Sequence, residues 1–227
     1  MSWIIKMLSS TLGKKLLMSL TGLFLISFLT IHLIGNLAIF SNDNGLAFNT
    51  YAAFMSTNPL IGTVSYLLYA GIILHVVIAI ILYFSNSSAR PVKYKVQNAK
   101  ENSTWSSRSM TLLGLLILAF ILLHLKDFWW QYKHNGGYQF VEDANGNKDI
   151  YILVIQQFKT TFALISYLVG LVALFLHLKH GFQSAFQTLG LEHKKYTPAI
   201  KAIGIAYAII VPLAFATMPV YVYFFDV

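Results

Sequence analysis

Long runs of apolar residues alternate along the chain with short segments that hold nearly all of its charges. A helix needs about 20 such residues to cross the hydrocarbon core of a membrane. The runs lack the two-residue alternation of a membrane barrel strand, so we expect each to be a helix. The pattern predicts an all-α integral membrane bundle that forms a single domain over residues 1–227. Its five transmembrane helices are expected at about 16–40, 61–84, 109–130, 160–178 and 202–225.

The segments between the predicted spans are short, apart from an outer loop over residues 131–159. Asn-Gly pairs at 135–136 and 145–146 are turn signals within this loop. The stretches Tyr138–Val141 and Ile150–Val154 flank the second turn, which predicts a small β-hairpin. A short interfacial helix is expected at Trp3–Leu12, ahead of the first span.

Basic residues set the expected orientation, because Lys and Arg in short loops are retained on the cytoplasmic side of a membrane. Of the 16 Lys and Arg residues, only Lys126, Lys133, Lys148 and Lys159 fall on the side opposite the N-terminal segment. We therefore expect a cytoplasmic amino terminus and a carboxyl terminus outside. The basic residues on the cytoplasmic side are Lys6, Lys14, Lys15, Arg90, Lys93, Lys95, Lys100, Arg108, Lys179, Lys194, Lys195 and Lys201.

The composition agrees with a multi-pass membrane protein. Hydrophobic residues make up 57% of the chain and charged residues 11%, with a mean hydropathy of +0.65, whereas an ordinary soluble domain is about 25% charged. The net charge of +8 is spread between the spans and does not indicate a nucleic-acid partner. The chain has no Cys, which excludes disulfides, thiolate metal sites and cysteine-bound iron-sulfur clusters on this chain.

Four histidines are the main candidates for function, because ionisable side chains inside spans are costly and rare. His32, His75, His124 and His177 lie one in each of the first four predicted spans. Any one of them is as readily explained by a hydrogen bond to a neighbouring helix, but their depths form a pattern. At about 1.5 Å per residue, His32 and His124 lie roughly 24 to 26 Å from the inner boundary. His75 and His177 lie roughly 21 to 27 Å from the outer boundary. We call His32 and His124 the outer pair, and His75 and His177 the inner pair.

Two level imidazoles that face each other across a bundle can hold a haem iron, hold a bare metal or relay protons. A bare transition metal usually takes three or four protein ligands, and each pair offers two. Haem needs only two axial ligands, and its apolar faces suit helices rich in Leu, Ile and Phe. The histidine pattern therefore favours two b-type haems, with the iron of each held by one pair.

The local sequence around these histidines resembles that of a known family. The stretches that carry the resemblance are Thr30-Ile31-His32-Leu33-Ile34-Gly35-Asn36, Ile73-Leu74-His75-Val76, Leu123-His124-Leu125-Lys126-Asp127-Phe128-Trp129 and Leu176-His177-Leu178-Lys179-His180-Gly181-Phe182. Together, over nearly the whole chain, they resemble the single-chain, five-helix, di-haem cytochrome b subunit of succinate dehydrogenase and fumarate reductase. In that family the axial ligands pair the first helix with the third and the second with the fourth, which agrees with the depth count. The family pattern of a histidine four residues before a glycine selects His177 over His180.

The resemblance implies a multi-pass subunit in the cytoplasmic membrane of a bacterium, within the respiratory chain and the tricarboxylic acid cycle. Its partners would be a flavoprotein subunit, which carries FAD and the dicarboxylate site, and an iron-sulfur subunit, both docked on the cytoplasmic face. Electrons would pass from succinate through these partners to the inner haem, the outer haem and a membrane quinone, commonly menaquinone. Fumarate reduction would reverse the path. No catalytic residue for the dicarboxylate is then expected on this chain.

Further candidate residues lie near the ends of the predicted spans. At the inner end, His180, Arg108 and Lys93 would contact a haem propionate or the iron-sulfur partner. Asp127 follows His124 by three residues and, with Trp129, is a candidate for contact with quinone or for proton transfer. The alternatives are ordinary roles at a membrane surface: positive-inside charge, an interfacial histidine, an end-cap carboxylate and an aromatic belt.

Two other interpretations of the histidine pattern stay open. Histidines relay protons in some small transporters and channels, although such a protein would string them along one path and break its helices in mid-span. A di-haem cytochrome b of another respiratory enzyme, such as hydrogenase or formate dehydrogenase, would share the depth pattern. Only the local motifs favour the succinate family over these.

Overall fold

The computed structural model describes residues 2–88 and 105–225, and it is 83% helical with no strand among the described residues. This confirms the predicted all-α class. In chain order the elements are α1 (Trp3–Ser9), α2 (Thr11–Asn36), η1 (Leu37–Phe40), α3 (Leu46–Thr57), α4 (Pro59–Ser88), α6 (Trp105–Arg108), α7 (Met110–His124), the π-helical segment η2 (Leu125–Trp130), α8 (Gln131–His134), α9 (Ile150–Phe158), α10 (Thr161–Thr188) and α11 (Thr197–Phe224).

Five helical stretches among the described residues are long and apolar enough to cross a membrane, as the hydrophobic pattern predicts. Most of them run beyond the predicted windows, because a helix continues through polar turns that a hydrophobic window leaves out. α10 shows this: Thr160 caps its first turn by accepting a hydrogen bond from the backbone N–H of Ala163 at 3.2 Å, and the helix continues to Thr188, well past residue 178. The stretches are Thr11–Phe40, Pro59–Ser88, Met110–His134, Thr161–Thr188 and Thr197–Phe224.

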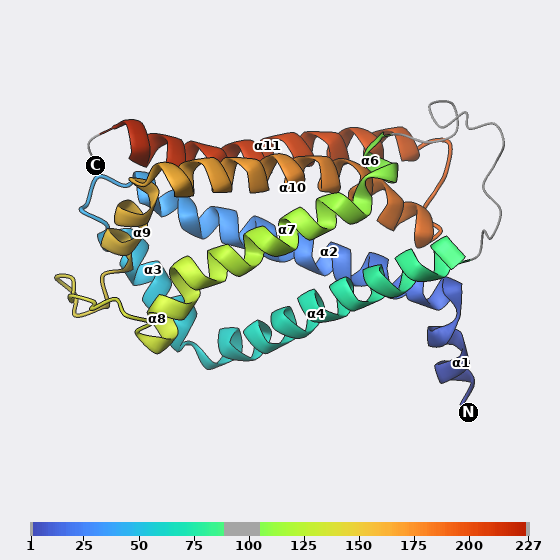
Figure 1. Ribbon diagram of the computed structural model, residues 1–227, viewed down its shortest axis with the longest axis horizontal. Coiled ribbons are helices and arrows are strands. Elements are labelled where there is room, and N and C mark those ends of the chain that lie inside the picture. The colour runs from blue at the N-terminus through green and yellow to red at the C-terminus, as the bar shows by residue number, and fades with distance from the viewer. Residues whose placement is uncertain (1, 89–104, 226–227) are drawn as a thin grey trace.

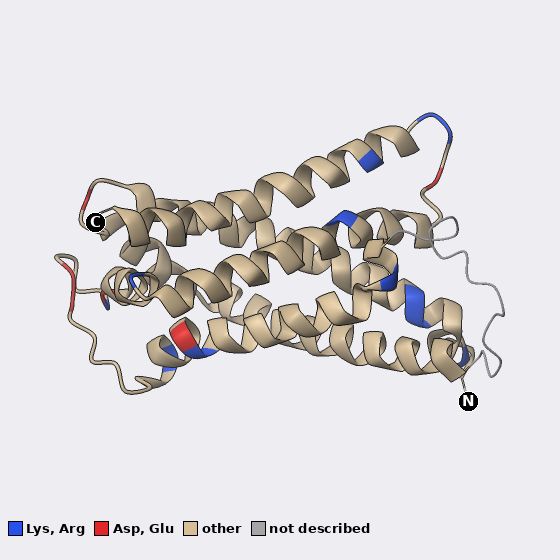
Figure 2. Ribbon diagram, turned by 45° about the horizontal axis from the view of Figure 1, so that its top comes forward, with Lys and Arg blue, Asp and Glu red and all other residues tan. Residues whose placement is uncertain are grey.

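The long helices lie side by side, and the two chain ends lie at opposite ends of the bundle (Figure 1). α10 is the central helix and packs against α11, α7 and α2, whereas α4 packs mainly against α2. Figure 2 shows that charged residues gather toward the two ends and leave the middle of the bundle free of them. This arrangement suits a multi-pass membrane protein, and the cytoplasmic placement of the amino terminus stays a prediction.

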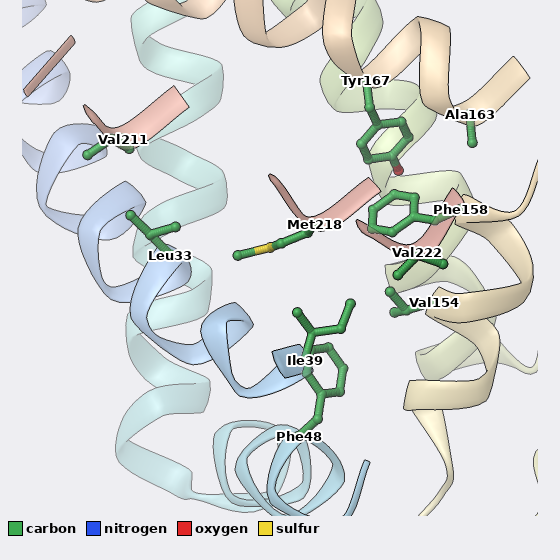
Figure 3. Close-up of a cluster of buried hydrophobic side chains, with 10 residues drawn as sticks. All are labelled: Leu33, Ile39, Phe48, Val154, Phe158, Ala163, Tyr167, Val211, Met218 and Val222. Carbon is green, nitrogen blue, oxygen red and sulfur yellow. The ribbon is translucent and has the colours of Figure 1, made fainter. Parts of the chain in front are cut away.

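Short helices cover the end of the bundle that holds the carboxyl terminus. There α3 and α9 pack against each other, and α9 also packs against α11. The buried apolar cluster of this end joins these short helices to the spans (Figure 3). Its members are Leu33, Ile39, Phe48, Val154, Phe158, Ala163, Tyr167, Val211, Met218 and Val222.

The predicted β-hairpin of the outer loop is wrong. Ile150–Val154 begins α9, and the only antiparallel bridge among the described residues joins Glu142 to Lys148. The β-branched composition of this stretch suggested a strand. The side chain of Asp149, however, caps a helix by accepting a hydrogen bond from the N–H of Ile152 at 3.1 Å, and Val154 packs into the apolar cluster.

A short helix also forms near the amino terminus, close to the predicted interfacial segment. α1 ends at Ser9, and Ser10 begins α2 by accepting a hydrogen bond from the N–H of Gly13 at 3.0 Å. The apolar side chains of α1 are exposed, and Trp3 is 72% accessible. Exposure of this kind is what an interfacial helix offers to lipid.

Candidate functional site

The outer pair comes together between two helices. His32 lies on α2 and His124 is the last residue of α7, and their ring centroids are 5.7 Å apart with the ring planes at 89°. Aromatic rings surround the pair: Phe28 and Phe215 lie 5.3 and 5.7 Å from the His32 ring, and Phe120 lies 5.9 Å from the His124 ring. The two imidazoles therefore face each other in largely apolar surroundings.

The inner pair forms between the other two helices that carry a predicted candidate. His75 on α4 and His177 on α10 have ring centroids 6.4 Å apart and an interplanar angle of 62°. The backbone of α2 lies beside them, since a Cβ added at Gly22 would lie 3.5 Å from Cε1 of His75. The structure thus brings the four histidines together as the two pairs that the depth count predicts.

The distance between the two levels follows from contacts along two helices. On α2, Thr21 contacts His75, and His32 lies eleven residues further on, which is about 16 Å of helix. On α10, Tyr167 contacts His124, and His177 lies ten residues further on, which is about 15 Å. Both helices therefore place the two pairs about 15 to 16 Å apart. At this separation the pairs form two separate sites and not one cluster.

One histidine of each pair has its Nδ1 atom beside a hydroxyl oxygen whose own proton is engaged elsewhere. Thr21 Oγ1 lies 3.0 Å from His75 Nδ1 and donates to the carbonyl of Leu17 at 2.8 Å. Tyr167 OH lies 3.4 Å from His124 Nδ1 and donates to the side chain of Asp127 at 3.3 Å. A hydroxyl that donates elsewhere offers the histidine a lone pair.

With the hydroxyl protons directed in this way, Nδ1 carries the proton in His75 and His124, and Nε2 keeps a lone pair able to bind a metal. The other two histidines are held differently. Asn36 Nδ2 lies 3.4 Å from His32 Nδ1, but its shorter bond, at 2.8 Å, goes to the His32 carbonyl. His177 Nδ1 is buried with no hydrogen-bond partner among the described residues.

A π-helical segment begins directly after His124. In such a turn the N–H bonds to the carbonyl five residues back, and these insertions are frequent at functional sites. Asp127 lies within this segment, η2, and is 7% exposed. The sequence marked Asp127 as a candidate, and the structure connects it to His124 through Tyr167.

Asp127 also lines a pocket of about 410 Å³ at the end of the bundle that holds the carboxyl terminus. Polar side chains from three segments meet there, including Gln131 of α8, Tyr138 of the following loop and Gln157 of α9. The carboxyl of Asp127 therefore stands between this pocket and the buried Tyr167. Trp129 is not among the residues that line this pocket: its ring lies 6.0 Å from that of Tyr69 on α4, and its indole N–H is buried without a partner among the described residues.

The pairs fit two axial ligands of one iron. Two imidazoles that bind one metal at about 2.0 to 2.1 Å have ring centroids about 6 Å apart, and the observed values are 5.7 and 6.4 Å. Among the described residues no three His, Asp or Glu side chains form a group able to hold a bare metal ion. Two nitrogen donors in apolar surroundings suit a macrocycle that brings its own four nitrogens.

The remaining candidates lie toward the opposite end. His180 is partly buried on α10, one turn beyond His177, and α6, which ends at Arg108, packs against the same helix. Lys93 lies outside the described residues. Arg108 and His180 therefore share an end of the bundle.

Thr21 and Tyr167 are the site residues that sequence reasoning did not select. Their signal is weak, since hydroxyl side chains are common in membrane helices and usually bond to their own backbone.

Comparison of the chain with protein-family models, with curated proteins and with solved structures finds no match. The function is therefore inferred from the residues of the site.

Proposed function

We propose that this chain is the di-haem b membrane anchor subunit of a succinate:quinone oxidoreductase. It would pass electrons between an iron-sulfur subunit and a membrane quinone, with menaquinone the expected type, and it would dock the subunits that carry FAD and the dicarboxylate site. The observation that carries the proposal is the division of four histidines into two facing pairs, 5.7 and 6.4 Å between ring centroids, on four different helices.

Haem iron held by two imidazoles supplies reversible one-electron transfer at a potential that the protein adjusts. The residues of this chain hold and orient those imidazoles. Thr21 and Tyr167 fix the proton of one histidine in each pair on Nδ1. The aromatic rings around the outer pair keep water away from it.

The two ends of the bundle would serve different partners. The proposal assigns the docked subunits to the inner end, near Arg108 and His180. It assigns the quinone to the outer end, where Asp127 lines a pocket with Gln131 and Gln157. The side-chain amides of Gln131 and Gln157 are donors of the kind that a quinone carbonyl needs.

The spacing of the pairs argues against the proton-relay interpretation. A relay by imidazoles needs hydrogen-bonded groups in succession, and the two pairs are separated by about 15 Å of helix on both α2 and α10. The assignment to the succinate family, rather than to a hydrogenase or formate dehydrogenase, rests on the local sequence motifs around the four histidines.

One experiment separates the three functions. The full chain is purified in mild detergent with the subunits that accompany it, and haem b absorbance is followed after succinate, hydrogen or formate is added to separate samples. We expect succinate to reduce the haem and flavin to be present. A His32→Ala/His75→Ala chain, which retains neither pair, is the control that ties the absorbance to this subunit.

Reduction by hydrogen or formate, and not by succinate, would overturn the assignment to a succinate enzyme and favour another respiratory complex. A folded chain without haem would overturn the electron-transfer function altogether and favour the transporter.

A further inference from the structure

We infer that Tyr167 is a positioning residue for the outer pair: its hydroxyl links His124 Nδ1 to the Asp127 carboxylate and so fixes the orientation and donor strength of that imidazole. This inference rests on the proposed function, because it takes Nε2 of His124 as a ligand of haem iron. It goes beyond that function in assigning a role to two groups, Tyr167 and Asp127, that bind no metal themselves.

The position of the Tyr167 ring is set by its neighbours. Tyr167 is 4% exposed, on the central helix α10. Its ring packs edge to face against Phe120 and Phe158, with centroids 5.1 Å away in each case, and against Phe128 at 6.0 Å. Rings on several sides leave the hydroxyl little freedom, so its two polar contacts are built into the fold.

The direction of the two hydrogen bonds follows from the final acceptor, the carboxyl group of Asp127. The acceptor is Oδ2 of Asp127, to which Tyr167 OH donates at 3.3 Å. The phenol oxygen then accepts from His124 Nδ1, 3.4 Å away. The order is imidazole N–H, phenol O–H, carboxylate, which leaves Nε2 of His124 with its lone pair.

The inner pair also has a hydroxyl beside one histidine, but that hydroxyl does not lead on to a carboxylate among the described residues. Thr21 accepts from His75 in the same way, but its proton goes to the neutral carbonyl of Leu17 at 2.8 Å. Hydrogen bonds that end on a charged acceptor are stronger than those that end on a neutral one. The outer pair alone therefore contains an imidazole polarised toward a carboxylate among the described residues.

Polarisation of this kind makes an imidazole a stronger electron donor through its other nitrogen. A stronger donor stabilises oxidised iron relative to reduced iron. Removal of the Tyr167 hydroxyl should therefore raise the midpoint potential of the outer haem and leave the inner haem unchanged.

The test is a potentiometric titration of both haems in the purified complex, with Tyr167→Phe compared to the natural chain. The variant keeps the buried ring and loses only the hydroxyl. We expect two bound haems and a shift of about tenfold in the oxidised-to-reduced ratio of the outer one, which is about 59 mV for a one-electron couple. The control is Tyr207→Phe, since Tyr207 bonds Thr30 at 2.9 Å and contacts neither histidine through its hydroxyl.

A second substitution tests the order of the chain. Asp127→Asn should shift the outer potential in the same direction in the natural background and have little effect when Tyr167 is already Phe, because it acts through the phenol. An equal shift in both backgrounds would show that Asp127 acts through space and would overturn the inference. If Tyr167→Phe loses both haems, the Asp127→Asn shift alone decides, and an unchanged outer potential overturns the inference.

The result also separates this inference from the proposed function. Two haems with an outer potential that Tyr167→Phe leaves unchanged would refute the role of Tyr167 and leave the di-haem function intact. A natural chain that is folded and binds no haem would remove both.

Discussion

The hydroxyl oxygen of Thr21 on α2 lies 3.0 Å from Nδ1 of His75 on α4. Because the Thr21 proton is directed at the carbonyl of Leu17, its oxygen accepts from the histidine and fixes the proton on Nδ1. This contact joins two helices and orients one member of the inner pair, so the packing of α4 and the orientation of the His75 ring depend on the same atom.

Replacing Thr21 by Val keeps the shape of the side chain and removes this acceptor. We expect the inner haem to bind about 10- to 100-fold more weakly, as is typical when a partner of a metal ligand is lost, and the outer haem to be unaffected. Haem titration into the apoprotein measures this. Ser27→Ala is the matched control, because Ser27 lies on the same helix and its hydroxyl bonds, among the described residues, only to the carbonyl of Leu23 on that helix. Equal inner-haem affinity in Thr21→Val and Ser27→Ala would contradict the role of the hydroxyl.

Gly170 sets the distance between α10 and α7 close to the outer pair. A Cβ at this position would lie 2.5 Å from Cγ of Phe120, whereas a Cβ at Gly114 of α7 meets nothing within 4 Å. We expect Gly170→Ala to destabilise the protein by about 1 to 3 kcal/mol through overpacking and to reduce outer-haem occupancy. Gly114→Ala should be neutral or stabilising by up to about 1 kcal/mol, because Ala favours a helix. Thermal unfolding in detergent compares the two, and equal behaviour would contradict the close packing.

Asn49 joins the short helices at the outer end. Its Nδ2 donates to Asp149 at 2.9 Å, and its Oδ1 accepts from the N–H of Tyr151 at 2.9 Å, while the side chain is fully buried. Asn49→Ala leaves the N–H of Tyr151 without this acceptor and removes one of the two hydrogen bonds to Asp149 Oδ1, so it should cost about 1 to 3 kcal/mol of stability. Asn145→Ala is the exposed control, since the Asn145 side chain makes a single hydrogen bond within residues 2–88 and 105–225, to Thr50 at 3.5 Å. Chemical unfolding measures the stability of both variants. An Asn49→Ala chain no less stable than the Asn145→Ala chain would contradict the role of Asn49.

The sequence was most informative where membrane physics leaves few choices. A long uncharged run can only be a helix, so the five spans and the depth of each histidine followed from counting residues. The rotation of each helix about its own axis leaves almost no trace in hydropathy. For that reason the contacts of Thr21 and Tyr167 with the histidines needed the structure.

Local features set by packing were also hidden. Ile150–Val154 reads as a strand by composition, but Asp149 caps it as a helix and Val154 is buried in the cluster of Figure 3. The π-helical turn after His124 depends on packing against neighbouring elements, and nothing in the sequence of Leu125–Trp130 predicts it. α3 was missed because its twelve residues are too few to span a membrane.

The orientation of the bundle is open to a direct test because the natural chain has no Cys. Single cysteines at exposed positions of the two ends, Ala144→Cys and Lys194→Cys, report the side on which each lies. From the distribution of basic residues we expect a membrane-impermeant maleimide to label position 144 in intact cells and position 194 only after lysis. The reverse labelling would show that the amino terminus lies outside.

The pairing of the histidines predicts which haem each substitution removes. His32→Ala or His124→Ala should remove the outer haem and leave the inner one, and His75→Ala or His177→Ala should do the reverse. Separate midpoint potentials identify the haem that remains. His193→Ala is the control, because His193 is exposed in the connection between α10 and α11. Loss of the same haem from all four variants would contradict two independent pairs.

The central claim, that this chain holds two b-type haems, is tested most directly by the haem content of the purified protein. A pyridine haemochrome assay, with a reduced-minus-oxidised spectrum of the same sample, gives the number of haems per chain. The account predicts two in the natural chain and in His193→Ala, and one in each single variant of the two pairs. A folded natural chain with no haem would contradict it.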